Sequence, residues 1–68
     1  MNMIKLRMKC VEQVMTQRDL ADAIGISLSS LQRKLRDNGD SFTLGEILKI
    51  KEALKLSDQE AKELFFDD

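Results

Sequence analysis

Hydroxyl, amide and guanidinium groups gather between Thr16 and Arg36, and their chemistry is the most informative in the chain. They are Ser29, Ser30, Gln32, Arg33 and Arg36, with Lys34 near the edge of the same helical face. Such groups can hydrogen-bond the edges of bases and the oxygens of phosphates. The alternative is an ordinary solvated helix surface. We favour the binding interpretation, since these side chains share one face.

The sequence offers few candidate residues for catalysis or for metal binding. The chain has no His and one Cys, Cys10, which excludes His-based relays and nearly all zinc sites. No paired-carboxylate cleft, phosphate loop or nucleophile arrangement stands out. We therefore expect a binding protein and no enzyme, with no cofactor, no metal and no small-molecule substrate. Cys10 is expected to be a small buried hydrophobe.

The length and composition fit one globular domain over residues 1–68. Of the 68 residues, 43% are hydrophobic and 34% charged, a balance that disfavours disorder. No apolar run is long enough to span a membrane, and the first residues lack the features of a signal peptide. A single Cys permits no internal disulfide, which suits a reducing compartment. We expect a cytoplasmic protein with no membrane partner.

Charge is distributed unevenly. Residues 1–36 hold seven cations and three anions, a net +4, whereas residues 37–68 hold four cations and nine anions, a net −5. One face could therefore be built for phosphate. The alternative is chance variation among charged helix faces, and the overall pI of about 5.4 argues against a polyanion partner.

Apolar spacing and capping signals predict an all-α fold of five helices. The first covers roughly residues 3–13, where Ile4, Met8, Val11 and Met15 form one stripe flanked by Leu6 and Cys10. Thr16 and Ser27 can cap the second and third helices, and Gly25 ends the second. Their inward residues are Leu20, Ala21 and Ile24, then Leu28, Leu31 and Leu35.

Two capping boxes open the fourth and fifth helices. They are Thr43 with Glu46 and Ser57 with Glu60, and Phe42 with Ile47 adds a hydrophobic staple. The fourth helix is expected to bury Ile47, Ile50 and Leu54, with Leu44 or Leu48 beside them. The fifth should bury Ala61, Leu64 and one of Phe65 and Phe66, and the other either seeds a dimer contact or remains an ordinary surface residue. The acidic end, Asp67-Asp68, is expected to fray.

The second and third helices are joined by Gly25-Ile26-Ser27. This turn is too tight for antiparallel packing, so the two helices must cross steeply, as in a helix-turn-helix. Ala21 matters at the crossing, because a larger side chain would push the helices apart.

The stretch TQRDLADAIGISLSSLQRKL resembles the helix-turn-helix of the Cro and repressor family of temperate phages. The matching positions are Thr16-Gln17, Leu20-Ala21, Ile24-Gly25-Ile26-Ser27 and Leu31. LGEILKIKEALKLS is similar to the fourth helix of that family, and Glu63-Leu64-Phe65-Phe66 looks like the end of short prophage-borne members. Together these cover roughly residues 3–66.

The resemblance implies a compact five-helix, lambda-repressor-like DNA-binding domain and assigns roles by position. Gln17 would anchor a phosphate near a helix N-terminus. Ser27, Leu28, Ser29 and Arg33 would face bases, with Gln32 and Arg36 at the edge. Arg33 is the strongest candidate for a guanine contact, because its fork fits two major-groove acceptors. Leu28 could touch a thymine methyl or lie in the core, which we favour.

In function, the resemblance implies a sequence-specific transcriptional regulator, a Cro-like phage or prophage repressor. It would bind a twofold-symmetric double-stranded DNA operator as a homodimer, its recognition helices about 34 Å apart. The alternative is a protein-interaction module on the same scaffold, with DNA binding lost and the acidic second half facing a basic partner.

Three positions depart from the family pattern. Val14 stands where many members have a glycine ending the first helix. Lys34 stands where many have an apolar residue, which puts the detailed list of base contacts in doubt. Lys51 replaces a small residue in the fourth helix.

Overall fold

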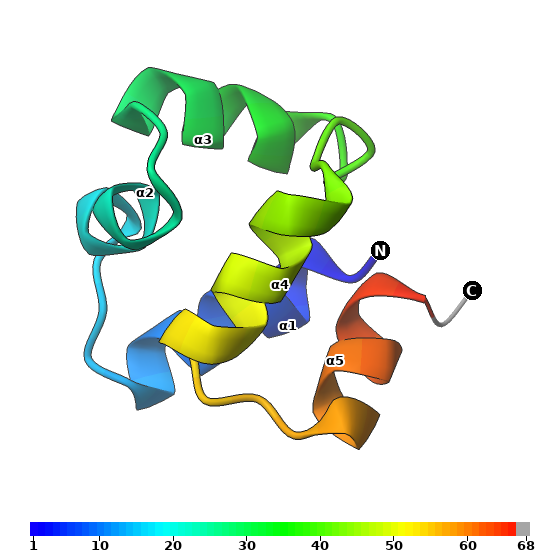
Figure 1. Ribbon diagram of the computed structural model, residues 1–68. Helices are drawn as coiled ribbons and strands as arrows, with labels where there is room; N and C mark the ends of the chain where they lie inside the picture. Colours follow the sequence, from blue (N-terminus) through cyan, green and yellow to red (C-terminus); the bar gives the residue numbers. More distant parts are fainter. Residues whose placement is uncertain (67–68) are drawn as a thin grey trace.

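A computed structural model describes residues 1–66 of the chain, and Figure 1 shows them folded as a compact all-α globule. The helices in the described part are α1 (Met3–Glu12), α2 (Gln17–Ile24), α3 (Leu28–Arg36), α4 (Leu44–Ala53) and α5 (Asp58–Phe65). This confirms the predicted all-α class and helix order. The expected fraying of Asp67-Asp68 falls outside the described residues. None of the five helices is long and apolar enough to cross a bilayer.

Side-chain caps begin every helix. The side-chain oxygens of Asn2, Thr16, Ser27, Thr43 and Ser57 each accept a hydrogen bond from a backbone N–H in the first turn. The predicted boxes at Thr43 and Ser57 are present in both directions, and Asp19 completes a third box with Thr16. Each cap satisfies backbone donors that the helix itself leaves without a partner, so local sequence fixes where each helix starts.

The core lies where α2 packs against α3 and α4 and where α1 packs against α5. Its most buried large side chains are Leu6, Leu20, Ile24, Leu31, Ile50, Leu54 and Leu64. The expected inward faces of α2, α4 and α5 are confirmed by the burial of Ala21, Ile47, Ala61 and Phe65. Cys10 is buried as expected, and loss of hydration raises the pKa of its thiol.

α1 carries two apolar stripes, and the one that packs inward is Met3, Leu6 and Cys10. Three residues of the stripe that predicted the helix face solvent, with Ile4 74%, Met8 60% and Val11 75% exposed, whereas the fourth, Met15, lies beyond α1 and packs against the core. The spacing of apolar residues at intervals of four and three positions therefore identified the helix but not which of its sides is buried. The backbone N–H of Asn2 donates to the carbonyl of Leu64 (2.8 Å), which joins the start of α1 to α5.

Three smaller expectations about burial need correction. Neither Leu44 nor Leu48 joins the buried face of α4, and both are more than half exposed. Leu28 is half-buried at the start of α3 and lies outside the core cluster, which corrects the favoured core assignment. Of the two adjacent phenylalanines, Phe65 packs inward and Phe66 is exposed, because neighbours on a helix point in different directions.

Lys34 is buried rather than at the edge of an exposed face. Its Nζ donates to the backbone carbonyl of Ser41 (2.9 Å) and lies 3.3 Å from a carboxylate oxygen of Glu46. It also sits 5.9 Å from the centre of the Phe42 ring. The lysine thus fills an inward position with its aliphatic stem and satisfies its charge at the start of α4. This places Leu31, Lys34 and Leu35 on the inward side of α3.

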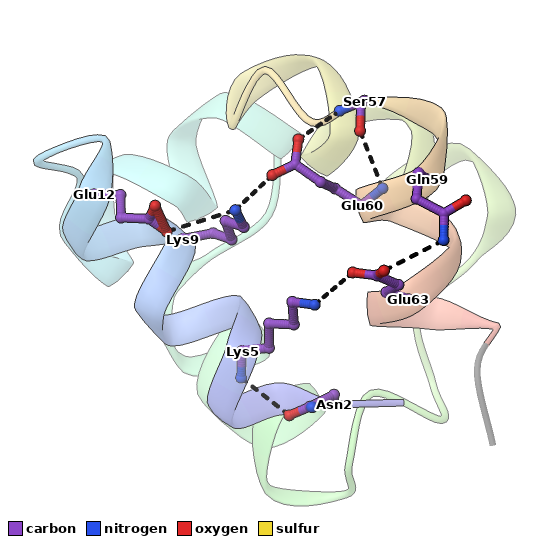
Figure 2. A network of polar contacts seen from close by, with 8 residues as sticks. All are labelled: Asn2, Lys5, Lys9, Glu12, Ser57, Gln59, Glu60 and Glu63. Atoms are coloured by element: carbon purple, nitrogen blue, oxygen red, sulfur yellow. Dashed lines mark hydrogen bonds and ion pairs between the residues drawn. The ribbon is translucent and has the colours of Figure 1, made fainter.

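Ion pairs join α1 to α5 (Figure 2). Lys5 Nζ lies 2.6 Å from Glu63 and Lys9 Nζ lies 2.5 Å from Glu60, which also accepts from the backbone N–H of Ser57 (3.0 Å). Lys9 is 3.6 Å from Glu12 as well. Cations of the basic half are thereby neutralised by anions of the acidic half, so part of the charge asymmetry of the sequence is internal.

The chain leaves α1 through a valine in a left-handed conformation. Gln13 caps the helix, and Val14 follows with φ 53° and 90% exposure. The position after the cap, which glycine would favour, is therefore occupied by a β-branched residue. Such a residue is strained in this conformation, because its Cβ approaches the backbone.

We expect Val14→Gly to raise the free energy of unfolding by about 0.5–1 kcal/mol, because glycine removes this strain at some entropic cost in the unfolded chain. Val11→Gly is the matched control. Val11 is a similarly exposed valine inside α1, where glycine should lower stability by about 0.5 kcal/mol. Urea unfolding of both variants checks this. Equal signs for the two would contradict the account of Val14.

Acid should destabilise the fold through the α1–α5 pairs. The Lys9 ammonium, with the Ser57 backbone N–H, lowers the pKa of Glu60 from 4.5 to about 2. A carboxyl with a lowered folded-state pKa stabilises the protein above its unfolded pKa, and this contribution is lost as the pH falls through the folded value. The free energy of unfolding should therefore decrease between about pH 4.5 and about pH 2.

Glu60→Gln should make that decrease shallower, since glutamine keeps the capping hydrogen bond but does not titrate. Glu52→Gln, an exposed carboxylate in no described ion pair, is the control and should leave the slope unchanged. Urea unfolding at a series of pH values measures the slopes. Parallel curves for native protein and Glu60→Gln would refute this role of Glu60.

Candidate nucleic-acid interface

A three-residue turn orients α3 against α2. Gly25 adopts φ 79° and ψ 29°, a left-handed conformation in which its own N–H and that of Ile26 reach back to the end of α2. The Ile26 N–H donates to the carbonyl of Ala21 (3.0 Å), and Ser27 then caps α3. In Figure 1 α2 is seen nearly end-on while α3 runs across the view, so the two axes are steeply inclined. The predicted crossing is present.

One face of α3 is free of the core. At roughly 100° per residue, Ser29, Gln32, Arg33 and Arg36 fall within about a quarter to a third of the helix circumference. All four are exposed, opposite the buried side chains of Leu31, Lys34 and Leu35. The structure therefore brings these four predicted residues together on an accessible surface. We call this set the α3 face.

The other three predicted site residues lie beside the α3 face, at the start of α2 and of α3. Gln17 is half-buried in the first turn of α2, and its Oε1 accepts a long hydrogen bond from Gln32 Nε2 (3.5 Å). Ser27 Oγ accepts from the backbone N–H of Ser30 (3.1 Å), so this hydroxyl caps the helix. Leu28 contributes an apolar, half-buried side chain next to it.

A shallow hollow of about 270 Å³ borders the α3 face. It is lined by Arg7 of α1, Gln17 of α2, and Gln32, Leu35 and Arg36 of α3. Two guanidinium and two amide groups therefore converge from three helices, and no carboxylate lines the hollow. Such a set of donors suits an anion with several acceptor oxygens. From the sequence, Arg7 was grouped with Lys5 and Lys9 as either phosphate contacts or solvated charges, and the solvated interpretation was favoured for all three.

The three cations of α1 differ in whether they form ion pairs. Lys5 and Lys9 are held by Glu63 and Glu60 on the opposite flank of α1, whereas Arg7 is exposed and makes no ion pair within residues 1–66. The same holds for Arg18, Arg33 and Arg36. Every arginine of the chain is thus exposed and outside the described ion-pair network. Arginine is the side chain best suited to bidentate contacts with phosphate or guanine.

The described part of the chain has no comparable cluster of side chains for metal binding or catalysis. No group of three acidic, His or Cys side chains there could hold a metal ion. Lys51 pairs with Asp58, and the carboxylate of Asp37 at the end of α3 is held by Ser41, whose hydroxyl hydrogen bond lowers the pKa of Asp37. The α3 face and its hollow are therefore the strongest candidate site.

Comparison with known proteins identifies one family. Searches among curated proteins and among solved structures give no significant match. A family model described as a protein of unknown function, DUF739, matches residues 1–68. The chain therefore belongs to the DUF739 family.

Proposed function

We propose that this protein is a sequence-specific DNA-binding regulator of transcription, and that α2, its turn and α3 form a helix-turn-helix of the Cro and repressor type. The observation that carries the proposal is the α3 face: two arginines, a glutamine and a serine are exposed together and free of the described ion pairs. A helix with such a face fits the major groove, where these groups find base-edge acceptors and donors. The protein would act in the cytoplasm, where it would repress a promoter by occluding it.

Phosphate contacts would set the register of α3 on the duplex. Gln17, at the start of α2, adds its amide to a helix N-terminus that favours anions. Arg7 and Arg36 flank it in the hollow and would hold the same stretch of backbone. Phosphate contacts position a protein on DNA but do not distinguish one base sequence from another. Arg33, Gln32 and Ser29 would therefore make the contacts that distinguish the bases.

The competing function is a protein-interaction module that uses the acidic second half. Four of its carboxylates, Glu46, Asp58, Glu60 and Glu63, pair with lysines of the same chain. Fewer of these charges are therefore open to a basic partner than the sequence alone suggests. This contrast with the unpaired arginines is why we favour DNA.

Site selection from a random pool of duplexes tests the proposal, with a shift assay on the intergenic DNA next to the gene. A twofold-symmetric preferred site, bound most tightly at low salt, is the expected result. No binding of either DNA at low salt would refute the proposal and leave the protein-interaction alternative.

Arg33→Ala should weaken binding to the selected site by about 1–3 kcal/mol and relax the preference at one base pair of each half-site. Arg33→Lys is the sharper control, because lysine keeps the charge but lacks the bidentate fork. It should lose the base preference and retain the dependence on salt. Affinities for the selected site and for its single-base variants measure both effects. Unchanged discrimination in both variants would show that another residue reads the base.

Arg7→Ala should weaken binding to all duplexes alike. The logarithm of affinity falls with the logarithm of salt concentration by about 0.9 per neutralised phosphate, so this variant should reduce the slope by about 1. Lys62→Ala, which removes an exposed cation from α5, should leave the slope unchanged. Fluorescence anisotropy over a salt series provides the slopes. Equal slopes for Arg7→Ala and native protein would remove Arg7 from the interface.

A further inference from the structure

The outer stripe of α1 is an apolar surface that the fold leaves uncovered. Ile4, Met8 and Val11 line a shallow groove of about 450 Å³, bordered by Arg7 on one flank and Glu12 on the other. A surface helix normally has one apolar stripe, facing the core, but α1 has a second on its opposite side. The stripe is contiguous, since its residues are three and four positions apart.

We propose that this outer stripe is a dimer interface and that its occupant is α1 of a second copy, packed antiparallel. The DNA-facing part of this inference rests on the proposed function, whereas the contact between two copies does not. Two features of α1 argue for a second copy in this orientation: the charges that border the stripe, and the position of the hollow relative to it.

Charge complementarity favours the antiparallel orientation. When two antiparallel copies meet near Met8, Ile4 of one copy lies beside Val11 of the other, and each apolar side chain finds an apolar neighbour. On the flank towards α5, Glu12 of one copy then lies level with Lys5 of the other. Glu12 is more than half exposed, and the Lys5 side chain is 35% exposed, so both can reach a second copy despite their contacts within the chain.

The position of Arg7 gives the second argument. The twofold axis of an antiparallel helix pair is perpendicular to both helices, so the same flank of each copy lies on the same side of the dimer. The Arg7 flank borders the hollow with Gln17, Gln32 and Arg36. Antiparallel packing therefore turns both candidate DNA surfaces towards one side, where a single duplex could meet both. Parallel packing would turn them to opposite sides.

The size of the stripe predicts a weak contact. Each apolar side chain of this kind offers roughly 100 Å², so the three together offer roughly 300 Å² per copy. A standard stable interface buries roughly 800 Å² per partner. The two Arg7 guanidinium groups also approach each other on the DNA side, where phosphates would offset their repulsion. The free protein should therefore be in a monomer–dimer equilibrium that DNA shifts towards the dimer.

Cysteine cross-linking tests the orientation. An equal mixture of tagged Ile4→Cys and untagged Val11→Cys, with oxidised glutathione as the oxidant, should give at least tenfold more cross-linked dimer than either variant alone. The native chain is the background control, because its Cys10 is buried. Stronger cross-linking of each variant with itself would overturn the antiparallel arrangement. Yields no higher than those of Leu48→Cys, on α4, would overturn the interface.

Sedimentation velocity tests the energetics, first without DNA and then on the selected duplex. Met8→Lys should weaken dimerisation at least tenfold, whereas Leu48→Lys, at a comparably exposed leucine of α4, should have no effect. A native chain that is monomeric in both conditions, or one whose dimer is lost only in Leu48→Lys, would overturn the proposal. Cross-linking in the expected pattern without DNA binding would refute the proposed function alone. DNA binding without that pattern would refute the interface alone.

Discussion

The turn at Gly25 is the constraint on which the candidate site depends. With three residues between α2 and α3, the chain must end one helix and begin the next within a single short turn. The left-handed conformation of Gly25 allows this at little steric cost. Leu20, Ala21, Ile24 and Leu31 are all buried, and the packing of α2 against α3 holds α3 at its inclination. Once the inner side of α3 is held by this packing, its outer side must face solvent. The exposed groups of the α3 face thus follow from how the turn is built.

Electrostatics divides the same small surface into two parts. The lysines of the first half pair with carboxylates of the second half, and these pairs hold α1 to α5 and α3 to α4. Arg7 and Arg36 line the hollow between α1, α2 and α3, and Arg33 lies on the adjoining α3 face. A chain with a net charge of −1 can therefore still present a locally cationic surface to an anionic partner. Total charge is a poor guide to this local surface, because four carboxylates of the acidic half are paired with lysines of the same chain.

Local signals in the sequence predicted the helices and the candidate face well. Caps, boxes and the glycine turn act over four or five residues, so they can be recognised without knowledge of the fold. The inward residues of α2 and α5 followed from single apolar stripes. α1 was different, since it has apolar residues on two sides, and its own sequence does not indicate that Leu6 is buried and Ile4 is not.

Side chains whose partners are distant in sequence could not be predicted in this way. Lys34 is buried because Ser41 and Glu46 arrive from the next loop and helix to satisfy its ammonium. Arg7 could not be distinguished from Lys5 and Lys9 until α5 was seen to take the two lysines. Burial thus removes Lys34 from the edge of the α3 face, and the lack of a described ion pair adds Arg7 beside that face.

We propose that the unpaired arginines, and not the paired lysines or the acidic helix α5, meet a DNA duplex. Nuclear magnetic resonance of the ¹⁵N-labelled protein tests this most directly, because each arginine Nε–H gives its own signal. Titration with a selected duplex should shift the signals of Arg7, Arg33 and Arg36 and the backbone amides near Gln17. The amides of α5 should stay in place. Shifts confined to α4 and α5, with the arginine signals unmoved, would contradict the account.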